Sequence, residues 1–203
     1  FWQKACPFLS LRNCSSLSVL VHHEKDIHNY RVCDVLSEAV VKGNIAQWGV
    51  SIYGLEAALR ACDIQQCFLV QLPFGPINQY FARQGIIQKL DALEKVVMAR
   101  SVFAQGRLIE LINRVPLERV VLDDVVAELR FAIARLGVSI TDFSIGLALS
   151  EKGVSHVVIG VDSPDHLESL SNMMISNELK MFPQALLEKL RAYDGISGKP
   201  HLW

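Results

Sequence analysis

The sequence predicts a parallel α/β protein. Short apolar runs rich in valine, isoleucine and leucine alternate with longer segments of helical periodicity along the 203 residues. Most of these runs are apolar nearly throughout, which is typical of strands that helices cover in a parallel sheet. Alternation of this kind favours right-handed crossovers between the strands. Five expected strands fit either an open, doubly wound sheet or part of a closed barrel.

The expected strands are separated by helical patterns with recognisable ends. Gly43 is placed to end the first helix, and Gly137 is placed to end a helix that begins at Asp123. The apolar stripe of the first helix is expected to be Val32, Val35, Leu36, Ala39 and Val40. The strands are expected at Leu17–His22, Ile45–Ser51, Cys67–Gln71, Val96–Arg100 and Ser155–Val161.

The later helices have start signals of their own. Thr141 is expected to cap a helix over 142–149. Pro164 is expected to be the first residue of the helix that follows Ser163. The pattern also predicts an amphipathic helix over 183–193.

Composition limits the class of protein. Hydrophobic residues make up 51% and charged residues 20%, so we expect a compact domain rather than a disordered chain. The formal net charge of −1 gives no excess of positive charge that would attract nucleic acid or an anionic membrane. No apolar run approaches the roughly 20 residues that a membrane-spanning helix needs. We therefore expect no nucleic-acid partner and no membrane.

The cysteines indicate a reducing compartment. Their number is odd and no two form a CxxC pair, so neither a disulfide framework nor a zinc site is expected. The first ten residues also lack the charged-then-apolar order of a signal peptide. We therefore expect a cytoplasmic protein whose cysteines are small buried apolar residues. They are Cys6, Cys14, Cys33, Cys62 and Cys67.

Polar side chains end the first three expected strands. His22 and His23 face opposite ways if both lie on the strand, so only one of them can point at a given site. Ser51 would either hold a ligand carboxamide or cap the helix that follows it. Gln71 would serve either a ligand or a neighbouring backbone group. For His22, a strand-end histidine satisfied by backbone or water is the simpler alternative.

Two turns after the later strands suit phosphate. The turn after the fourth strand carries a hydroxyl at Ser101, an amide at Gln105 and a bare backbone at Gly106. Gly160 precedes a second turn, and backbone amides at the start of the next helix can receive an anion. Two such turns after late strands match the usual phosphate site of α/β barrels. The alternative is that these glycines only make turns.

Other sequence signatures are missing. There is no Walker sequence, no G-x-S-x-G elbow and no G-x-G-x-x-G fingerprint. The nucleotide-binding motif of open doubly wound sheets is therefore missing. No metal is expected, because four histidines show no metal-ligand spacing. They are His28, His156, His166 and His201.

Ordered segments of the chain resemble the aldo/keto reductase family, from the helix before its fourth barrel strand onward. LSLRNCSSLSVLVHH (9–23) resembles the third helix and fourth strand, which places His22 at the family's motif histidine. KGNIAQWGVSIYG (42–54) resembles the fifth strand, where a serine and an asparagine usually hold the nicotinamide amide. Ser51 is present here, and Ile52 replaces the asparagine. Gln71 matches the nicotinamide-contacting glutamine of the sixth strand.

The last segments resemble the phosphate and adenosine side of the same cofactor site. RSVFAQG (100–106) resembles the seventh-strand turn that approaches the pyrophosphate, with Arg100 where many members place an aromatic ring under the nicotinamide. VIGVDSPDHLESLSN (158–172) resembles the last strand and the adenosine-binding helix, with His166 at a position usually held by glutamine. Asp162 stands where many members have a basic residue or serine for the 2′-phosphate of NADP, and a carboxylate would repel that phosphate. The resemblance thus implies one catalytic residue, His22, and cofactor contacts from Ser51, Gln71, Arg100, Ser101, Gln105, Gly106, Gly160, Asp162, Ser163 and His166.

The resemblance implies a TIM-barrel-type (β/α) fold with NADP or NAD as cofactor. The implied activity is an oxidoreductase that reduces aldehyde, ketone or sugar-type carbonyls by hydride transfer. In the family a tyrosine donates the proton and a lysine lowers the pKa of that tyrosine. These two residues and an aspartate belong to the family's first three strand units, and none of them is placed here. The alternative is therefore a catalytically incompetent, reductase-like protein that works through binding or assembly.

The resemblance covers about five of the family's eight strand–helix units, as a single domain over residues 1–203. Because the resemblance begins at the helix before the family's fourth strand, it implies that the first three strands are missing, and the chain is also shorter than the roughly 250 residues of a complete barrel. A barrel without three strands exposes two sheet edges and an apolar interior, so we expect an oligomer or further residues before the first one. The cofactor site requires Ser51, Gln71, Ser101 and Gly160 to converge on a common rim.

Overall fold

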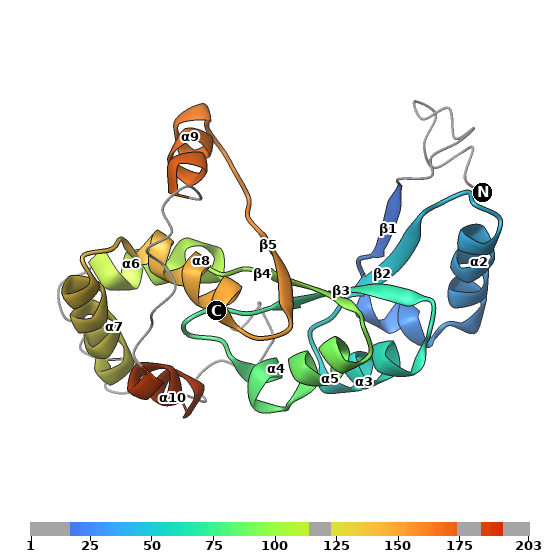
Figure 1. Ribbon diagram of the computed structural model, residues 1–203, viewed down its shortest axis with the longest axis horizontal. Helices are drawn as coiled ribbons and strands as arrows, with labels where there is room; N and C mark the ends of the chain where they lie inside the picture. The colour runs from blue at the N-terminus through green and yellow to red at the C-terminus, as the bar shows by residue number, and fades with distance from the viewer. Residues whose placement is uncertain (1–16, 114–122, 174–183, 193–203) are drawn as a thin grey trace. The chain divides into compact units, whose positions relative to one another are not determined.

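The computed structural model describes residues 17–113, 123–173 and 184–192 (Figure 1). Within this part of the chain, five strands alternate with helices, which confirms the predicted α/β class. The chain divides into two compact units, residues 1–71 and 72–203. The segment that resembles a third helix lies before residue 17, outside the described residues.

In the first unit, helices follow the strands along the chain. The elements are β1 (Ser18–Val21), the 3-10 helix η1 (Glu24–His28), α2 (Tyr30–Val41), β2 (Gln47–Ser51), α3 (Leu55–Asp63) and the greater part of β3 (Cys67–Pro73). The strands pair in parallel, with Val21 opposite Val50 and Ser51 opposite Gln71. The carboxyl ends of β1, β2 and β3 therefore lie at one edge of the sheet.

The second unit is richer in helices. It contains α4 (Tyr80–Arg83), α5 (Ile86–Ala92), β4 (Val96–Arg100), the 3-10 helix η2 (Ala104–Gly106), α6 (Arg107–Asn113), α7 (Asp123–Leu136), α8 (Ile140–Ser150), β5 (Val154–Val158), α9 (Pro164–Met173) and α10 (Gln184–Ala192). β4 and β5 pair in parallel, with Arg100 opposite Val158. The order of strands in the sheet is β1-β2-β3-β4-β5, which is the order of the chain.

The predicted strands agree with the structure except at their ends. β4 has the predicted bounds, and β1 is one residue shorter at each end than predicted. β3 continues two residues past the predicted Gln71, to Pro73. β5 ends at Val158 rather than at the predicted Val161. Apolar residues continue past Val158 but do not pair with β4. Hydropathy alone therefore predicts an end of β5 that lies beyond the observed one.

Each unit has its own apolar core. In the first unit, Trp48 and Val50 on β2 are fully buried. In the second, the fully buried side chains include Leu72, Phe74, Phe81, Ile87, Leu90, Val97, Leu108, Leu129 and Phe143. The predicted stripe of α2 is partly wrong. Leu36 and Ala39 are buried as predicted, but Val35 is 47% exposed, and Cys33 takes its place on the buried face.

Two helices end at glycine as predicted. Gly43 has a φ of 69° and its N–H donates to the carbonyl of Val40, while the next N–H donates to the carbonyl of Ala39. Gly137 has a φ of 66° and ends α7. A positive φ strains residues with a side chain, so glycine closes both helices without that strain.

The predicted cap of α8 is wrong. Ser139, not Thr141, precedes the helix, and its hydroxyl accepts a hydrogen bond of 3.0 Å from the N–H of Asp142. The Asp142 carboxylate accepts in return from the N–H of Ser139. This is a capping box in which aspartate takes the usual place of glutamate, so it satisfies two backbone donors at once.

Replacing Ser139 by alanine should lower the free energy of unfolding by about 1 kcal/mol, because one N-terminal donor of α8 then loses its acceptor. Urea denaturation followed by circular dichroism measures the loss. Thr141→Ala is the matched control and should cost less than about 0.5 kcal/mol. A larger loss in T141A than in S139A would contradict the observed cap.

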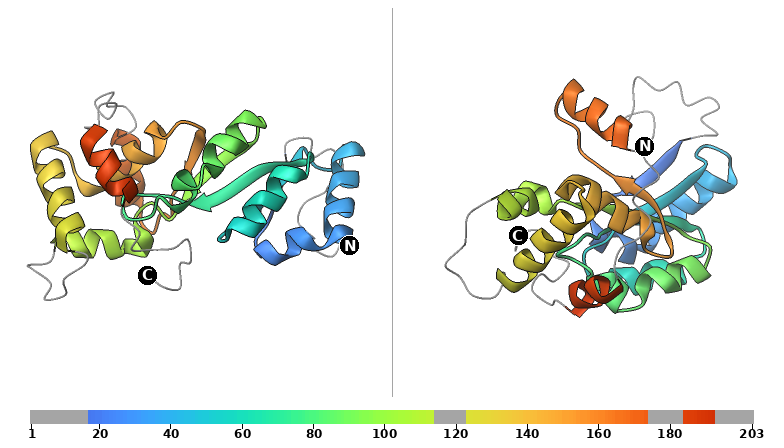
Figure 2. Two further views of the ribbon diagram at one scale, coloured as in Figure 1. Left: turned by 90° about the horizontal axis from the view of Figure 1, so that it is seen from below. Right: turned by 60° about the vertical axis from the view of Figure 1, so that its left-hand side comes forward.

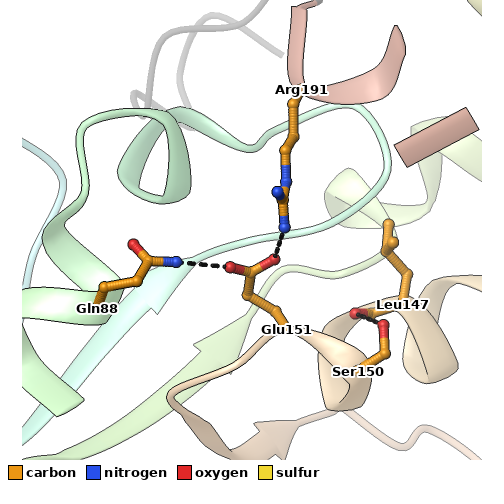
Figure 3. A network of polar contacts seen from close by, with 5 residues as sticks. All are labelled: Gln88, Leu147, Ser150, Glu151 and Arg191. Atoms are coloured by element: carbon orange, nitrogen blue, oxygen red, sulfur yellow. Dashed lines mark hydrogen bonds and ion pairs between the residues drawn. The ribbon is translucent and has the colours of Figure 1, made fainter. Parts of the chain in front are cut away.

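Polar contacts anchor α10 within the second unit (Figure 3). The buried carboxylate of Glu151, which follows α8, accepts hydrogen bonds from Arg191 at 2.7 Å and from Gln88 at 2.9 Å. Lys189 of α10 pairs with Glu128 of α7, and both views in Figure 2 show these two helices side by side. The predicted helix over 183–193 is therefore present at 184–192, and its two end residues lie outside the described part.

The described cysteines are buried and free, as the sequence predicts. They are Cys33, Cys62 and Cys67, whereas Cys6 and Cys14 lie outside the described residues. The thiol of Cys33 donates to the carbonyl of Ile27 at 3.3 Å. Burial raises the pKa of this thiol above its usual value, so it stays protonated and unreactive at neutral pH.

No single helix among the described residues is long and apolar enough to cross a membrane. Two consecutive helices, Val126–Leu136 and Ile140–Ser150, have the length and composition of a span only when taken together, and the chain bends by 94° between them.

Candidate functional site

The first unit brings Ser51 and Gln71 together at the carboxyl edge of its strands. The two residues are register partners, and the N–H of Ile52 donates to the carbonyl of Gln71 at 2.8 Å. Parallel strands present their last side chains to the same edge, so this adjacency follows from the register. Gly54, not Ser51, is the N-cap residue of α3.

The three predicted site residues of this unit differ in exposure. His22 follows β1 directly and is exposed, and its ring meets that of His23 edge-on with centroids 5.4 Å apart. Gln71 is half-buried. Ser51 is fully buried. Of these three residues, His22 and Gln71 are therefore open to solvent and Ser51 is not.

Sequence reasoning missed Glu24 in the same unit. One oxygen of its carboxylate accepts from the N–H of Tyr53 at 2.6 Å and from the N–H of Gly54 at 2.8 Å. The two amides lie at the start of α3, where the helix dipole is positive. The sequence shows Glu24 only as an acidic residue two positions after His22. The two amides that its carboxylate binds are 29 and 30 residues away along the chain.

The turn after β4 in the second unit has an unusual backbone. Ser101, Ala104 and Gln105 all have positive φ, at 55°, 47° and 58°, and Gly106 follows at 84°. Non-glycine residues seldom adopt this conformation, and such strain is concentrated at ligand sites. The predicted phosphate-suited turn therefore has more left-handed residues than its single glycine indicated.

Hydrogen bonds inside this turn hold its polar groups. The Arg100 guanidinium donates to the hydroxyl of Ser101 at 3.2 Å. The N–H of Gly106 donates to the carbonyl of Phe103 at 3.0 Å, so this amide is already used within the turn. Gln105 is exposed.

The turn between β5 and α9 forms the second predicted phosphate-suited segment. Ser163 accepts at its hydroxyl from the N–H of His166 at 3.2 Å, and Pro164 begins the helix as predicted. The carboxylate of Asp162 is 91% exposed and lies 3.2 Å from Nδ1 of His166. Gly160 is exposed. Asp162, Ser163 and His166 are therefore close together at the start of α9.

Each unit thus assembles its own part of the predicted site. Ser51 and Gln71 meet in the first unit, and Arg100 with Ser101 in the second. The convergence of Ser51, Gln71, Ser101 and Gly160 on one rim stays a prediction. Among the residues that the structure describes, no group of three or more histidine, cysteine, aspartate or glutamate side chains is arranged to hold a metal ion.

Parallel strand–helix units with polar turns at their carboxyl ends define the class of this protein: a (β/α) TIM-barrel-type fold, incomplete in this chain. The sequence model of one family, described as the aldo/keto reductase family, matches residues 10–183. The chain belongs to the aldo/keto reductase family. No curated protein sequence matches the chain significantly.

Solved structures show the same fold at low sequence identity. The holo form of an aldo-keto reductase from Bacillus halodurans is 15% identical, with a TM-score of 0.66 over 88% of this chain and 62% of its own. A glycerol dehydrogenase from Gluconobacter oxydans is 14% identical, with a TM-score of 0.62 over 90% of this chain and 61% of its own. An aldo/keto reductase from Klebsiella pneumoniae in complex with NADP and acetate is 16% identical, with a TM-score of 0.59 over 85% and 56%. The chain spans less than two thirds of the length of each.

Proposed function

We propose that this chain forms the cofactor-binding side of an NAD(P)H-dependent oxidoreductase that reduces aldehyde, ketone or sugar-type carbonyls. The observation that carries the proposal is the run of left-handed residues directly after β4, in a chain of this family. Strained turns at the carboxyl ends of parallel strands are where α/β enzymes hold their ligands. A similar structure from Klebsiella pneumoniae contains NADP, which supports the same class of cofactor here.

The residues present fit different parts of a nicotinamide dinucleotide. Ser51 and Gln71 offer a hydroxyl and a carboxamide, which would hold the nicotinamide amide. The turn at Ser101 would receive the pyrophosphate, and the start of α9 at Ser163 would receive the adenosine end. When bound, the cofactor supplies the hydride. His22 would donate a hydrogen bond to the substrate carbonyl oxygen, because it is exposed at the end of β1.

Titration of the purified protein with NADPH and NADH, followed by cofactor fluorescence, tests the proposal. We expect saturable binding of at least one of them, in both the 203-residue chain and any longer natural form. No binding of either cofactor by an intact full-length protein would end the proposal.

A second candidate function is binding or assembly without catalysis. Two departures at the cofactor site favour it: Ile52 stands where the family usually has an asparagine, and Asp162 is an exposed carboxylate at the expected 2′-phosphate position. Steady turnover of a carbonyl substrate by the purified chain would eliminate this candidate.

Asp162 should control the choice between NADPH and NADH. Its exposed carboxylate would repel a 2′-phosphate, although His166 at 3.2 Å offsets part of the charge when protonated. Asp162→Asn should tighten NADPH binding by about fivefold and leave NADH binding within about twofold, since one exposed charge interaction is worth about 1 kcal/mol. Asp165→Asn removes the same charge nearby, within the first turn of α9, and is the control. Equal gains in D162N and D165N would refute a local role for Asp162.

We also propose that the chain is one domain of a cytoplasmic protein and that it associates as a homo-oligomer. Ser155, His156 and Val158 on β5 are exposed, and an exposed strand favours association. Analytical ultracentrifugation tests this, and a stable monomer of 22.7 kDa in dilute solution would contradict it.

A further inference from the structure

The first unit contains a contact between two turns that the proposed function does not use. Glu24 lies in the segment after β1, two residues after His22. Its carboxylate is bound by the N–H groups of Tyr53 and Gly54, in the turn after β2 that follows Ser51. The contact therefore joins the segment that carries the proposed catalytic histidine to the turn behind a proposed nicotinamide contact.

The geometry makes this contact a strong one. Both amides donate to the same oxygen, Oε2, at 2.6 and 2.8 Å. Hydrogen bonds to an ionised acceptor are shorter and stronger than neutral ones. The two donors precede α3, whose dipole favours a negative charge at this end. A Cβ on Gly54 would lie 3.7 Å from each carboxylate oxygen, so the backbone approaches the side chain closely.

The contact belongs to a continuous chain of hydrogen bonds. The N–H of Ile52 donates to the carbonyl of Gln71, and the next two N–H groups along the backbone donate to Glu24. A backbone hydrogen bond thus joins the carboxyl ends of β2 and β3, and the Glu24 side chain joins the segment after β1 to the turn after β2. Without Glu24, the N–H groups of Tyr53 and Gly54 lose this acceptor.

We propose that Glu24 is a positioning residue for the nicotinamide end of the cofactor site. It fixes the turn after Ser51 relative to the segment that carries His22, without touching the cofactor itself. The Glu24 carboxylate also occupies the start of α3, so this helix terminus does not receive a phosphate group. This inference rests on the proposed function.

Three variants and two measurements test the inference. Glu24→Ala removes the acceptor, and Glu24→Gln keeps the size and one carbonyl oxygen. Glu38→Ala is the control, because Glu38 is an exposed carboxylate of the same unit that pairs with Lys42 near the end of its own helix. Amide hydrogen exchange at Tyr53 and Gly54 reports the contact. The NADH dissociation constant, measured by fluorescence well below the unfolding temperature, reports the site.

We expect E24A to speed exchange at both amides and to raise the NADH dissociation constant by about fivefold or more, because a misplaced binding group loses most of its contribution. E24Q should stay within about twofold of the natural protein, and E38A should not differ from it. If E24A does not fold, Glu24→Asp takes its place, since the shorter side chain withdraws the same oxygen.

Faster exchange in E24A with an unchanged dissociation constant would overturn the inference and leave the proposed function standing. Unchanged exchange would also overturn it, because the contact would then not hold the turn. If the natural protein binds neither NADH nor NADPH, the proposed function fails first and the inference fails with it.

Discussion

Replacing Gly49 by alanine should prevent stable folding. Gly49 on β2 is opposite Leu69 on β3, and a Cβ at Gly49 would lie 2.0 Å from the backbone oxygen of Leu69 and 2.3 Å from its Cβ. Neither atom can move away by a change of rotamer, because both are fixed by the backbone of a paired strand. The two strands would have to separate, and Trp48 beside Gly49 is fully buried. We expect a loss of more than about 4 kcal/mol in the free energy of unfolding.

Urea denaturation followed by far-ultraviolet circular dichroism measures this loss. Gly43→Ala is the matched control in the same unit. Gly43 has a positive φ, but no atom lies within 4 Å of the position that an added Cβ would take, so only the local conformation is strained. G43A should cost about 1 kcal/mol. If G49A and G43A unfold at the same urea concentration, the close approach of β2 and β3 is wrong.

Replacing Arg191 by methionine should lower the free energy of unfolding by about 2 kcal/mol. The carboxylate of Glu151 is buried, with an exposed side-chain fraction of 5%, and would keep Gln88 as its hydrogen-bond donor (Figure 3). A buried charge that loses its ionic partner keeps its desolvation cost. The loss is smaller than for a fully buried pair, because the Arg191 side chain is 42% exposed.

Two further variants separate this pair from a surface effect. Lys189→Met breaks the other ion pair of α10, whose side chains are 62% and 42% exposed, and should cost less than about 1 kcal/mol. Combining R191M with Glu151→Gln should cost less than the two single changes added together, since neither partner is then left charged and alone. Equal losses in R191M and K189M would show that Glu151 does not stabilise α10 through its charge.

The order and type of the elements could be predicted because they depend on local patterns. The apolar run from Val96 to Ala99 indicated β4, which the structure has at Val96–Arg100. Gly43 and Gly137 marked helix ends because a left-handed residue is needed there whatever the surroundings. The cap of α8 was misplaced for a related reason: Ser139 and Thr141 both suit an N-cap, and only the hydrogen-bond geometry distinguishes them.

The candidate site was predictable only in part. Ser51, Gln71 and Ser101 became candidates because polar residues at strand ends contrast with the apolar runs before them. The left-handed backbone at Ala104 and Gln105 was not predicted, because neither residue type requires it. Glu24 was overlooked because the sequence does not distinguish a glutamate exposed to solvent from a glutamate whose carboxylate accepts hydrogen bonds from two distant amides.

The sequence by itself determined the alternation of strands and helices, the positions of the polar strand ends and the family, because hydrophobic period and residue type act over a few neighbouring residues. Only the tertiary structure decided the contacts of Glu24 with the turn after β2, of Gly49 with Leu69, and of Glu151 with Arg191. These contacts join residues far apart along the chain. Their geometry depends on how strands and helices pack, and residue type alone does not specify which distant residue a side chain will contact.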